Sequence, residues 1–138
     1  MLFEFGMIQR GKSIYENYML NKELLSSVKS SRIDYVIIGH CHCDHIGLIP
    51  ALYQKKCEAS IIAPKGSTAI LKEMWLDSAY INGRDADILT VQREHTYLPL
   101  FTEDDVYTAL SHVQEIDFHE IVPLDEEVSL RYSYAGHI

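Results

Sequence analysis

The sequence predicts an α/β fold, on three observations. Short apolar runs rich in β-branched residues end at glycine or proline, and the clearest are Ile33–Ile38 and Ala59–Ala63. Segments with apolar residues at helical spacing separate such runs, as in layered domains in which helices cover a sheet. A cluster of histidines directly follows the first run. Open α/β sheets commonly place functional groups at this end of a strand.

Strand-like and helix-like segments alternate along most of the chain. The expected strands are Met1–Phe5, Ile33–Ile38, Ala59–Ala63, Ile116–Val122 and Val128–Tyr134. The expected helices are Lys12–Ser30, Ile46–Lys56, a segment that begins at Ser67, and Thr102 to about Val113. Pro50 lies near the start of the second helix, where proline is tolerated. The polar stretch Asn82–Asp87 is expected to form a loop, and Asp125–Glu127 a turn between the last two strands.

Two of the expected helices carry more specific signals. Thr102 can cap a helix, and Asp105 three residues later can reach back to it. The acidic run Glu103–Asp105 suits the positive end of a helix dipole, so it indicates a helix start and not a metal site. Trp75 shares a helical face with Met74 and Leu71, which predicts core packing in preference to base stacking.

Composition indicates a soluble, cytoplasmic protein of one domain. The chain has 138 residues, of which 47% are hydrophobic and 23% charged. No apolar run approaches the roughly 20 residues that span a bilayer, and the N-terminus does not resemble a signal peptide. The net charge of −8 argues against nonspecific nucleic-acid binding through a basic surface, although bound divalent cations would offset it locally.

The three cysteines do not suggest a disulfide framework. They are Cys41, Cys43 and Cys57, and an odd count without a secretory signal indicates a reducing compartment. Cys41 and Cys43 alternate with histidines, so an extended backbone would direct them to the opposite side. We therefore expect both to be packing residues, with metal binding as the alternative.

The chemistry lies in six consecutive residues, His40-Cys41-His42-Cys43-Asp44-His45. His40 and His42 are two positions apart, so both side chains point the same way from an extended segment. Asp44 and His45 follow where the chain turns into a helix. Zinc typically takes four ligands that converge on one point, and these four side chains suit two ions better than one. A surface histidine cluster is the alternative, but the position between strand and helix favours a functional site.

The segment Asp34–Pro50 resembles the second motif of the metallo-β-lactamase superfamily, His-x-His-x-Asp-His. Gly47 and Pro50 resemble the RNA-processing branch of that superfamily, the β-CASP nucleases. Further segments similar to that branch occur in the same order: Ser67–Leu71 with Leu76–Ser78, Leu100–Val106 and Tyr134–Ile138. The resemblance implies that residues 1–138 form a partial metallo-β-lactamase αββα-type fold, with a mixed sheet and flanking helices.

The resemblance also implies roles for individual residues. It assigns His40, His42 and His137 to one zinc ion, and Asp44 and His45 to a second. It implies hydrolysis of RNA by a hydroxide held between the ions, which Asp44 would help to orient as a catalytic residue. Neutral histidine ligands usually need an acceptor behind them. Glu4 is the candidate acceptor, because it stands where the first motif of the family has an aspartate.

The sequence also departs from the family pattern. The family has a strand hairpin before the position of Met1, and a bridging aspartate, the β-CASP insertion and further strands after Ile138. We therefore expect a chain that is catalytically weak unless another polypeptide completes the site. Exposed strand edges are expected to favour self-association or a complementary chain. Hydrolysis of small thioesters, lactones or phosphodiesters, and a non-catalytic scaffold, are the alternatives. His95, His112 and His119 are expected to be structural.

Overall fold

The four-stranded sheet is parallel throughout, in the order β1-β2-β3-β4. The computed structural model of the chain describes residues 1–137. The strands of the sheet are β1 (Leu2–Phe3), β2 (Tyr35–Ile37), β3 (Ser60–Pro64) and β4 (Val113–Ile116). Parallel neighbours need a crossover between them, and helices supply it here. A separate antiparallel pair, β5 (Val122–Pro123) and β6 (Ser129–Leu130), follows the sheet.

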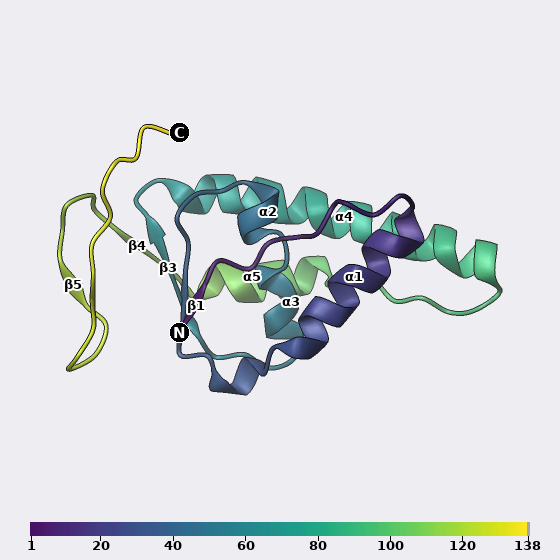
Figure 1. The fold of residues 1–138 in the computed structure, drawn as a ribbon, viewed down its shortest axis with the longest axis horizontal. Coiled ribbons are helices and arrows are strands. Elements are labelled where there is room, and N and C mark those ends of the chain that lie inside the picture. Colours follow the sequence, from purple (N-terminus) through teal and green to yellow (C-terminus); the bar gives the residue numbers. More distant parts are fainter. Residues whose placement is uncertain (138) are drawn as a thin grey trace.

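The helices lie together on one side of the sheet, and the β5–β6 pair lies on the other (Figure 1). The helices are α1 (Ile14–Ser27), the 3-10 turn Ser30–Arg32, α2 (Cys43–Ile46), α3 (Ile49–Gln54), α4 (Ser67–Arg93) and α5 (Glu103–Ser111). This arrangement confirms the α/β class predicted from the sequence. None of the helices within residues 1–137 combines the length and the apolar character needed to cross a membrane.

Alternation along the strands gives the sheet two apolar faces. Val36 and Ile61 belong to the main core beneath the helices, where both are fully buried. Ile37 and Ile62, the next residues along each strand, point to the opposite face and pack with Tyr132. Continuous β-branched runs are typical of parallel strands buried on both sides. The C-terminal segment therefore covers the face that the helices leave open.

The prediction of a loop at Asn82–Asp87 was wrong, because α4 continues through it to Arg93. Buried residues recur at helical spacing along the whole helix: Leu71, Trp75, Ala79, Ala86 and Leu89. The guanidinium of Arg93 lies 3.5 Å from the centre of the Tyr15 ring on α1, which adds a cation–π contact near the end of α4. The tertiary contacts thus outweigh the local polarity of the stretch.

Other boundaries differ by a few residues. The predicted helix Ile46–Lys56 is two short helices, α2 and α3, with Gly47 and Leu48 between them. Val113 starts β4 instead of ending a helix, because it pairs with Ile61 of β3. The capping box at Thr102 is confirmed, as is Pro50 in the first turn of α3. Most of Ile116–Val122 and Val128–Tyr134 is irregular, apart from β5, β6 and a bridge between Phe118 and Tyr132.

The N-terminal segment crosses α2 in close backbone contact. The amide of Phe5 donates to the carbonyl of His45 at 2.7 Å, and the amide of Met7 donates to that of Cys43 at 3.0 Å. In return the amide of Leu48 donates to the carbonyl of Phe5 at 2.9 Å. The side chain of Asn21, which is 2% exposed, holds the next part of the segment. Its Oδ1 accepts from the amide of Ile8, and its Nδ2 donates to the carbonyl of Ile8. These bonds fix the segment that carries Glu4.

Gly6 lies at the tightest point of this crossing. A β-carbon built on Gly6 would lie 1.6 Å from the carbonyl oxygen of Asp44, whereas one on Gly83 in α4 would meet nothing within 4 Å. We predict that Gly6→Ala lowers the free energy of unfolding by about 1–3 kcal/mol, because the segment must move away from α2. Gly83→Ala, the matched control, should raise it by about 0.5–1 kcal/mol through helix propensity. Urea denaturation measures both. Equal stabilities for the two variants would contradict the crossing described here.

Candidate metal centre

His40 and His42 stand in the loop between β2 and α2. The amide of Ile38 donates to the carbonyl of Ile62 at 2.9 Å, which anchors the start of the loop to the sheet. His42 then has extended backbone and directly precedes α2. The Nε2 atom of His40 lies 3.0 Å from the Nδ1 atom of His42. The two imidazoles therefore converge on one point, as the spacing of the motif predicts.

His137 reaches the same point from the other end of the chain. Its ring centre lies 5.0 Å from that of His40 and 5.3 Å from that of His42. One ring nitrogen from each of the three residues lies within 4.8 Å of the others. His42 and His137 are both exposed, so this group of donor atoms faces solvent. Three imidazole nitrogens at such spacing are suited to a single zinc-like ion with an open position.

Glu4 and His45 form a second contact behind the loop. The Nδ1 atom of His45 lies 2.5 Å from Oε2 of Glu4, and Oε1 of Glu4 lies 3.9 Å from Nδ1 of His40. A carboxylate oxygen accepts hydrogen bonds, so Nδ1 of His45 is the donor in this contact, and in a neutral imidazole Nε2 then has the free lone pair. That Nε2 atom lies 3.6 Å from Oδ2 of Asp44, whose side chain is 70% exposed.

The backbone at Glu4 is left-handed, with φ of 56°. A left-handed residue with a side chain costs about 1–2 kcal/mol, so the conformation needs support from its surroundings. The Glu4 amide donates to the carbonyl of Ile37 at 2.9 Å and so extends the pairing of β1 with β2. This turn at the end of β1 directs the carboxylate toward the histidine loop.

The surroundings favour neutral imidazole at His40. Partial burial lowers the pKa of His40, and repulsion from the neighbouring rings of His45 and His42 lowers it further. The charge of Glu4 raises the pKa of His40, but this effect is smaller than the effects that lower it. Metal ligands must be unprotonated, so a lowered pKa is the direction that a ligand histidine requires.

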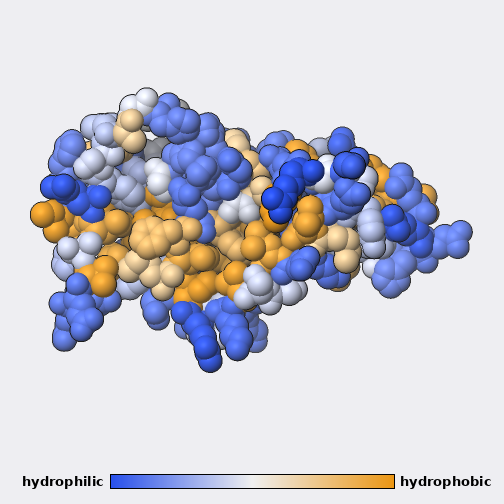
Figure 2. Space-filling model, in the orientation of Figure 1, coloured by the Kyte–Doolittle hydropathy of each residue, from blue (hydrophilic) through white to orange (hydrophobic). Residues whose placement is uncertain are grey.

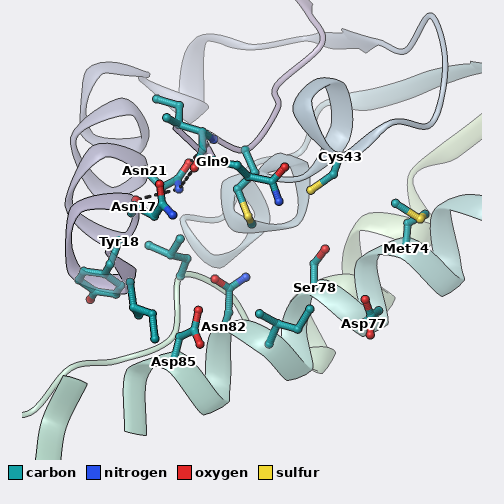
Figure 3. A pocket seen from close by; sticks show the side chains of 15 residues that line it. Gln9, Asn17, Tyr18, Asn21, Cys43, Met74, Asp77, Ser78, Asn82 and Asp85 are labelled. Carbon is teal, nitrogen blue, oxygen red and sulfur yellow. Dashed lines mark hydrogen bonds between the residues drawn. The ribbon is translucent and has the colours of Figure 1, made fainter. Parts of the chain in front are cut away.

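The two cysteines of the motif point away from the histidines. Cys41 is half-buried against the main core, and Cys43 is half-buried and lines a cavity together with Ser78 of α4. Burial raises the pKa of both thiols, which keeps them protonated. Figure 3 shows Cys43 directed into a cavity of about 250 Å³ between residues 7–9, α1 and α4. Neither group of converging donor atoms found within residues 1–137 includes a cysteine.

Helix α4 supports the loop from below. The indole Nε1 of Trp75, fully buried, donates to the carbonyl of Ile46 at 3.0 Å. That carbonyl is the last in α2 and has no partner within so short a helix. Ile46 and Leu48 beside it are also fully buried in the main core. The histidine loop thus rests on the main core, and Trp75 is a core residue as predicted.

The structure brings His40, His42 and His137 together, and it places Asp44 next to His45. Sequence reasoning identified Glu4 only as an acceptor, whereas its carboxylate also forms a group of donor atoms with His40 and His45. The signal was present in the topology. Glu4 follows β1 and His40 follows β2, and neighbouring parallel strands end at the same edge of a sheet.

The remaining histidines are outside both groups of donors within residues 1–137. His112 ends α5, where its Nδ1 atom lies 2.9 Å from the carbonyl of Thr108, and its ring packs on Tyr53 at 4.8 Å. His95 packs on Tyr97 at 5.4 Å. His119 has a left-handed backbone with φ of 68°. The predicted structural role therefore accounts for the contacts of His95 and His112.

Comparison with known proteins finds similarity to proteins named for RNA cleavage and transcription termination. The chain is 30% identical over 106 residues to Ribonuclease TTHA0252 of Thermus thermophilus, which covers 77% of this chain and 21% of that protein. It is 27% identical over 108 residues to Transcription termination factor FttA of Methanosarcina mazei, covering 78% of this chain and 15% of that protein. It is 26% identical over 110 residues to Probable RNase MJ4 of Methanocaldococcus jannaschii, covering 77% of this chain and 22% of that protein.

The chain thus spans about a fifth or less of the length of these curated relatives. No family model matches the sequence.

The contact between Glu4 and His45 should fix the tautomer of His45. We predict that neutral His45 carries its proton on Nδ1 in the wild-type chain and in Glu4→Gln, whose amide oxygen still accepts. In Glu4→Ala the acceptor is lost, so a substantial share of His45 should carry the proton on Nε2. Nitrogen-15 NMR of the imidazole ring in chelator-treated protein measures the two populations. The same tautomer in all three proteins would contradict the proposed orienting role of Glu4.

Proposed function

We propose that the chain is part of a metal-dependent phosphodiesterase that acts on RNA, a ribonuclease of the β-CASP type within the metallo-β-lactamase superfamily. The observation that carries the proposal is the convergence of three imidazoles, His40, His42 and His137, from two distant parts of the chain. The similarity to Ribonuclease TTHA0252 and Probable RNase MJ4 supports RNA as the substrate. The motif alone would admit other substrates of the superfamily.

The donor atoms suit zinc. Imidazole nitrogens and carboxylate oxygens are its usual ligands besides thiolates. His40, His42 and His137 would hold one ion, and Asp44 with His45 would hold the second. Zinc bound there would supply Lewis-acid chemistry, making a water molecule more acidic and stabilising negative charge on the phosphoryl oxygens. The protonated thiols of Cys41 and Cys43 are not part of either set.

The residues of the chain then have separate tasks. Glu4 orients His45 and keeps its Nε2 lone pair directed toward Asp44. Asp44, whose side chain is 70% exposed, is available on the solvent side to orient the attacking water and accept its proton. His137 approaches from the C-terminal segment and closes the opposite side of the site. We assign Asp44 the catalytic role on this basis.

Residues 1–137 supply only Asp44 and His45 to the second ion in this scheme. Zinc usually has four ligands, so water and groups from outside residues 1–137 would complete the coordination. We therefore propose that this chain binds the first ion more tightly than the second and hydrolyses RNA weakly by itself. An RNA substrate and free cysteines are consistent with a reducing compartment, and we propose the cytoplasm.

Metal content and RNA hydrolysis test this proposal together. Protein purified without chelators should contain one tightly held zinc per chain, with a second bound only when zinc is added. His42→Ala should lose the tight ion, Asp44→Ala only the weak one, and the control His112→Ala neither. Hydrolysis of single-stranded RNA should require both ions and fall roughly 10²-fold or more in Asp44→Ala.

Two results would overturn parts of the proposal. Equal zinc content in the wild type and His42→Ala would contradict the proposed metal centre. Hydrolysis of a thioester or lactone with a higher kcat/KM than that for RNA, under the same zinc concentration, would favour the wider superfamily over the ribonuclease.

We also propose that β1 pairs with a second copy of the chain. It is the outer strand of the sheet, so one of its edges has no partner strand in the structure. Phe3 is 67% exposed and Met1 45% exposed, and Figure 2 shows hydrophobic residues gathered along the middle of the face that carries β1 and α1. Unprotected strand edges and exposed apolar patches both favour association.

Sedimentation velocity should show a dimer that dissociates on dilution. Phe3→Lys should shift the equilibrium to the monomer, because a charged side chain on an edge strand opposes pairing. Tyr80→Lys, at a residue of α4 that is 71% exposed, is the control and should leave the dimer intact. A wild-type protein that stays monomeric at the highest concentration measured would rule out this association.

A further inference from the structure

A shallow pocket of about 280 Å³ adjoins the histidine cluster. His40 and His137 line one end of it, and Phe118, Tyr132 and Tyr134 form an aromatic wall. No part of the proposed metal chemistry uses the three aromatic residues. The pocket therefore joins the candidate metal centre to an aromatic surface.

Tyr134 lies flat on Phe118. Their ring centres are 4.0 Å apart and their planes are inclined by only 12°. Tyr134 is nevertheless 70% exposed, because only one of its faces is covered. Phe118 is half-buried and packs against the apolar cluster of Ile37, Ile62 and Tyr132 on the open face of the sheet. Phe118 is thus anchored in the protein, and Tyr134 stacks on it and faces solvent.

The backbone holds this pair in place. His119 has a left-handed backbone, with φ of 68°, and its amide donates to the carbonyl of Tyr132 at 2.8 Å. Tyr132 is itself fixed, since its hydroxyl donates to the carbonyl of Ile62 at 2.9 Å. The His119 ring stands at 65° to that of Tyr134, with 5.8 Å between centres. Left-handed residues other than glycine are uncommon and cluster where structure serves a functional geometry.

Hydrophobic cover alone explains the exposed ring poorly. A tyrosine that remains 70% exposed contributes little burial, and Phe118 already contacts the sheet cluster. The position of Tyr134 is informative, because only two residues separate it from His137 in the candidate centre. Tyr134 lines the same pocket as His40 and His137, so a planar group stacked on Tyr134 in that pocket would adjoin the histidine cluster.

A nucleobase is the planar group that suits this surface. Every base has a π face, and stacking of an unpaired base on an aromatic side chain is tolerant of sequence. Lys65 has its Nζ 2.8 Å from Oδ1 of Asp117, the residue before Phe118, so a carboxylate offsets the charge of this lysine. With a chain charge of −8, little affinity would come from a basic phosphate track. Stacking and the bound ions would then provide most of the binding free energy.

We propose that Tyr134, supported by Phe118, is a stacking subsite for one unpaired base of single-stranded RNA next to the reacting phosphodiester. This rests on the proposed function, because the subsite is assigned to the substrate of that centre. Base-paired RNA keeps its bases inside the helix and would not use the subsite. Binding through stacking also depends less on salt than binding through phosphate contacts.

Binding of a fluorescent single-stranded RNA, measured by anisotropy with zinc present, tests the subsite separately from cleavage. Tyr134→Leu should weaken binding roughly 10-fold or more, in line with the loss of one stacked base, whereas Tyr134→Phe should stay close to the wild type. Tyr80→Leu is the matched control, since Tyr80 is 71% exposed on α4, and it should have no effect. A single abasic position at the stacked nucleotide should weaken binding to the wild type but not to Tyr134→Leu.

Photo-crosslinking with iodouridine in the same RNA should label Tyr134, and zinc content should be equal in the wild type and in Tyr134→Leu. Unchanged affinity in Tyr134→Leu, or crosslinks confined to other residues, would overturn the subsite and leave the ribonuclease proposal intact if RNA is still cleaved. Loss of zinc along with affinity would also overturn it, because Tyr134 would then act through His137. Tyr134-dependent binding without any zinc-dependent cleavage would retain the subsite and reject the ribonuclease. Absence of RNA binding by the wild type would reject both.

Discussion

The backbone crossing of residues 5–7 over α2 is the constraint on which the candidate centre depends. Three backbone hydrogen bonds join residues 5 and 7 to α2 and to Leu48 just after it, and a β-carbon at position 6 would clash with the carbonyl of Asp44. The crossing places Glu4 opposite His45. The left-handed backbone at Glu4 costs about 1–2 kcal/mol. A hydrogen bond to a charged group contributes about 1.5–3 kcal/mol, so the contact with His45 can offset that cost.

The buried contacts that support the histidine loop and the donor atoms that face solvent lie on opposite sides of that loop. The inner side carries the half-buried cysteines, and the indole of Trp75 donates to the carbonyl at the end of α2. The outer side carries the histidines and Asp44, which are half-buried or exposed. Alternation can separate Cys41 from His40 and His42, which precede α2, whereas Cys43, Asp44 and His45 lie on different sides of the first turn of α2. One stretch of six residues can therefore be both a core element and a cluster of donor atoms.

Sequence patterns predicted the features that depend on local chemistry. The strands β2 and β3, the capping box at Thr102 and the convergence of His40 with His42 each follow from a few neighbouring residues. The continuation of α4 through Asn82–Asp87 could not be predicted in this way, because it depends on burial of Ala86 and Leu89 in the folded chain. The donor role of Glu4 depends on which strands become neighbours, and the stacking of Tyr134 on Phe118 depends on a left-handed turn at His119.

The C-terminal segment connects these observations. It covers the open face of the sheet through Tyr132, presents Tyr134 to solvent and then delivers His137 to the histidine loop. All three functions lie within six residues, Tyr132–His137, so their geometry is coupled. Because the hydroxyl of Tyr132 donates to Ile62 and the ring of Tyr134 stacks on Phe118, contacts within the chain itself hold this aromatic surface. A surface held in this way loses little conformational entropy when a planar ligand stacks on it, which is the physical advantage of a preorganised site.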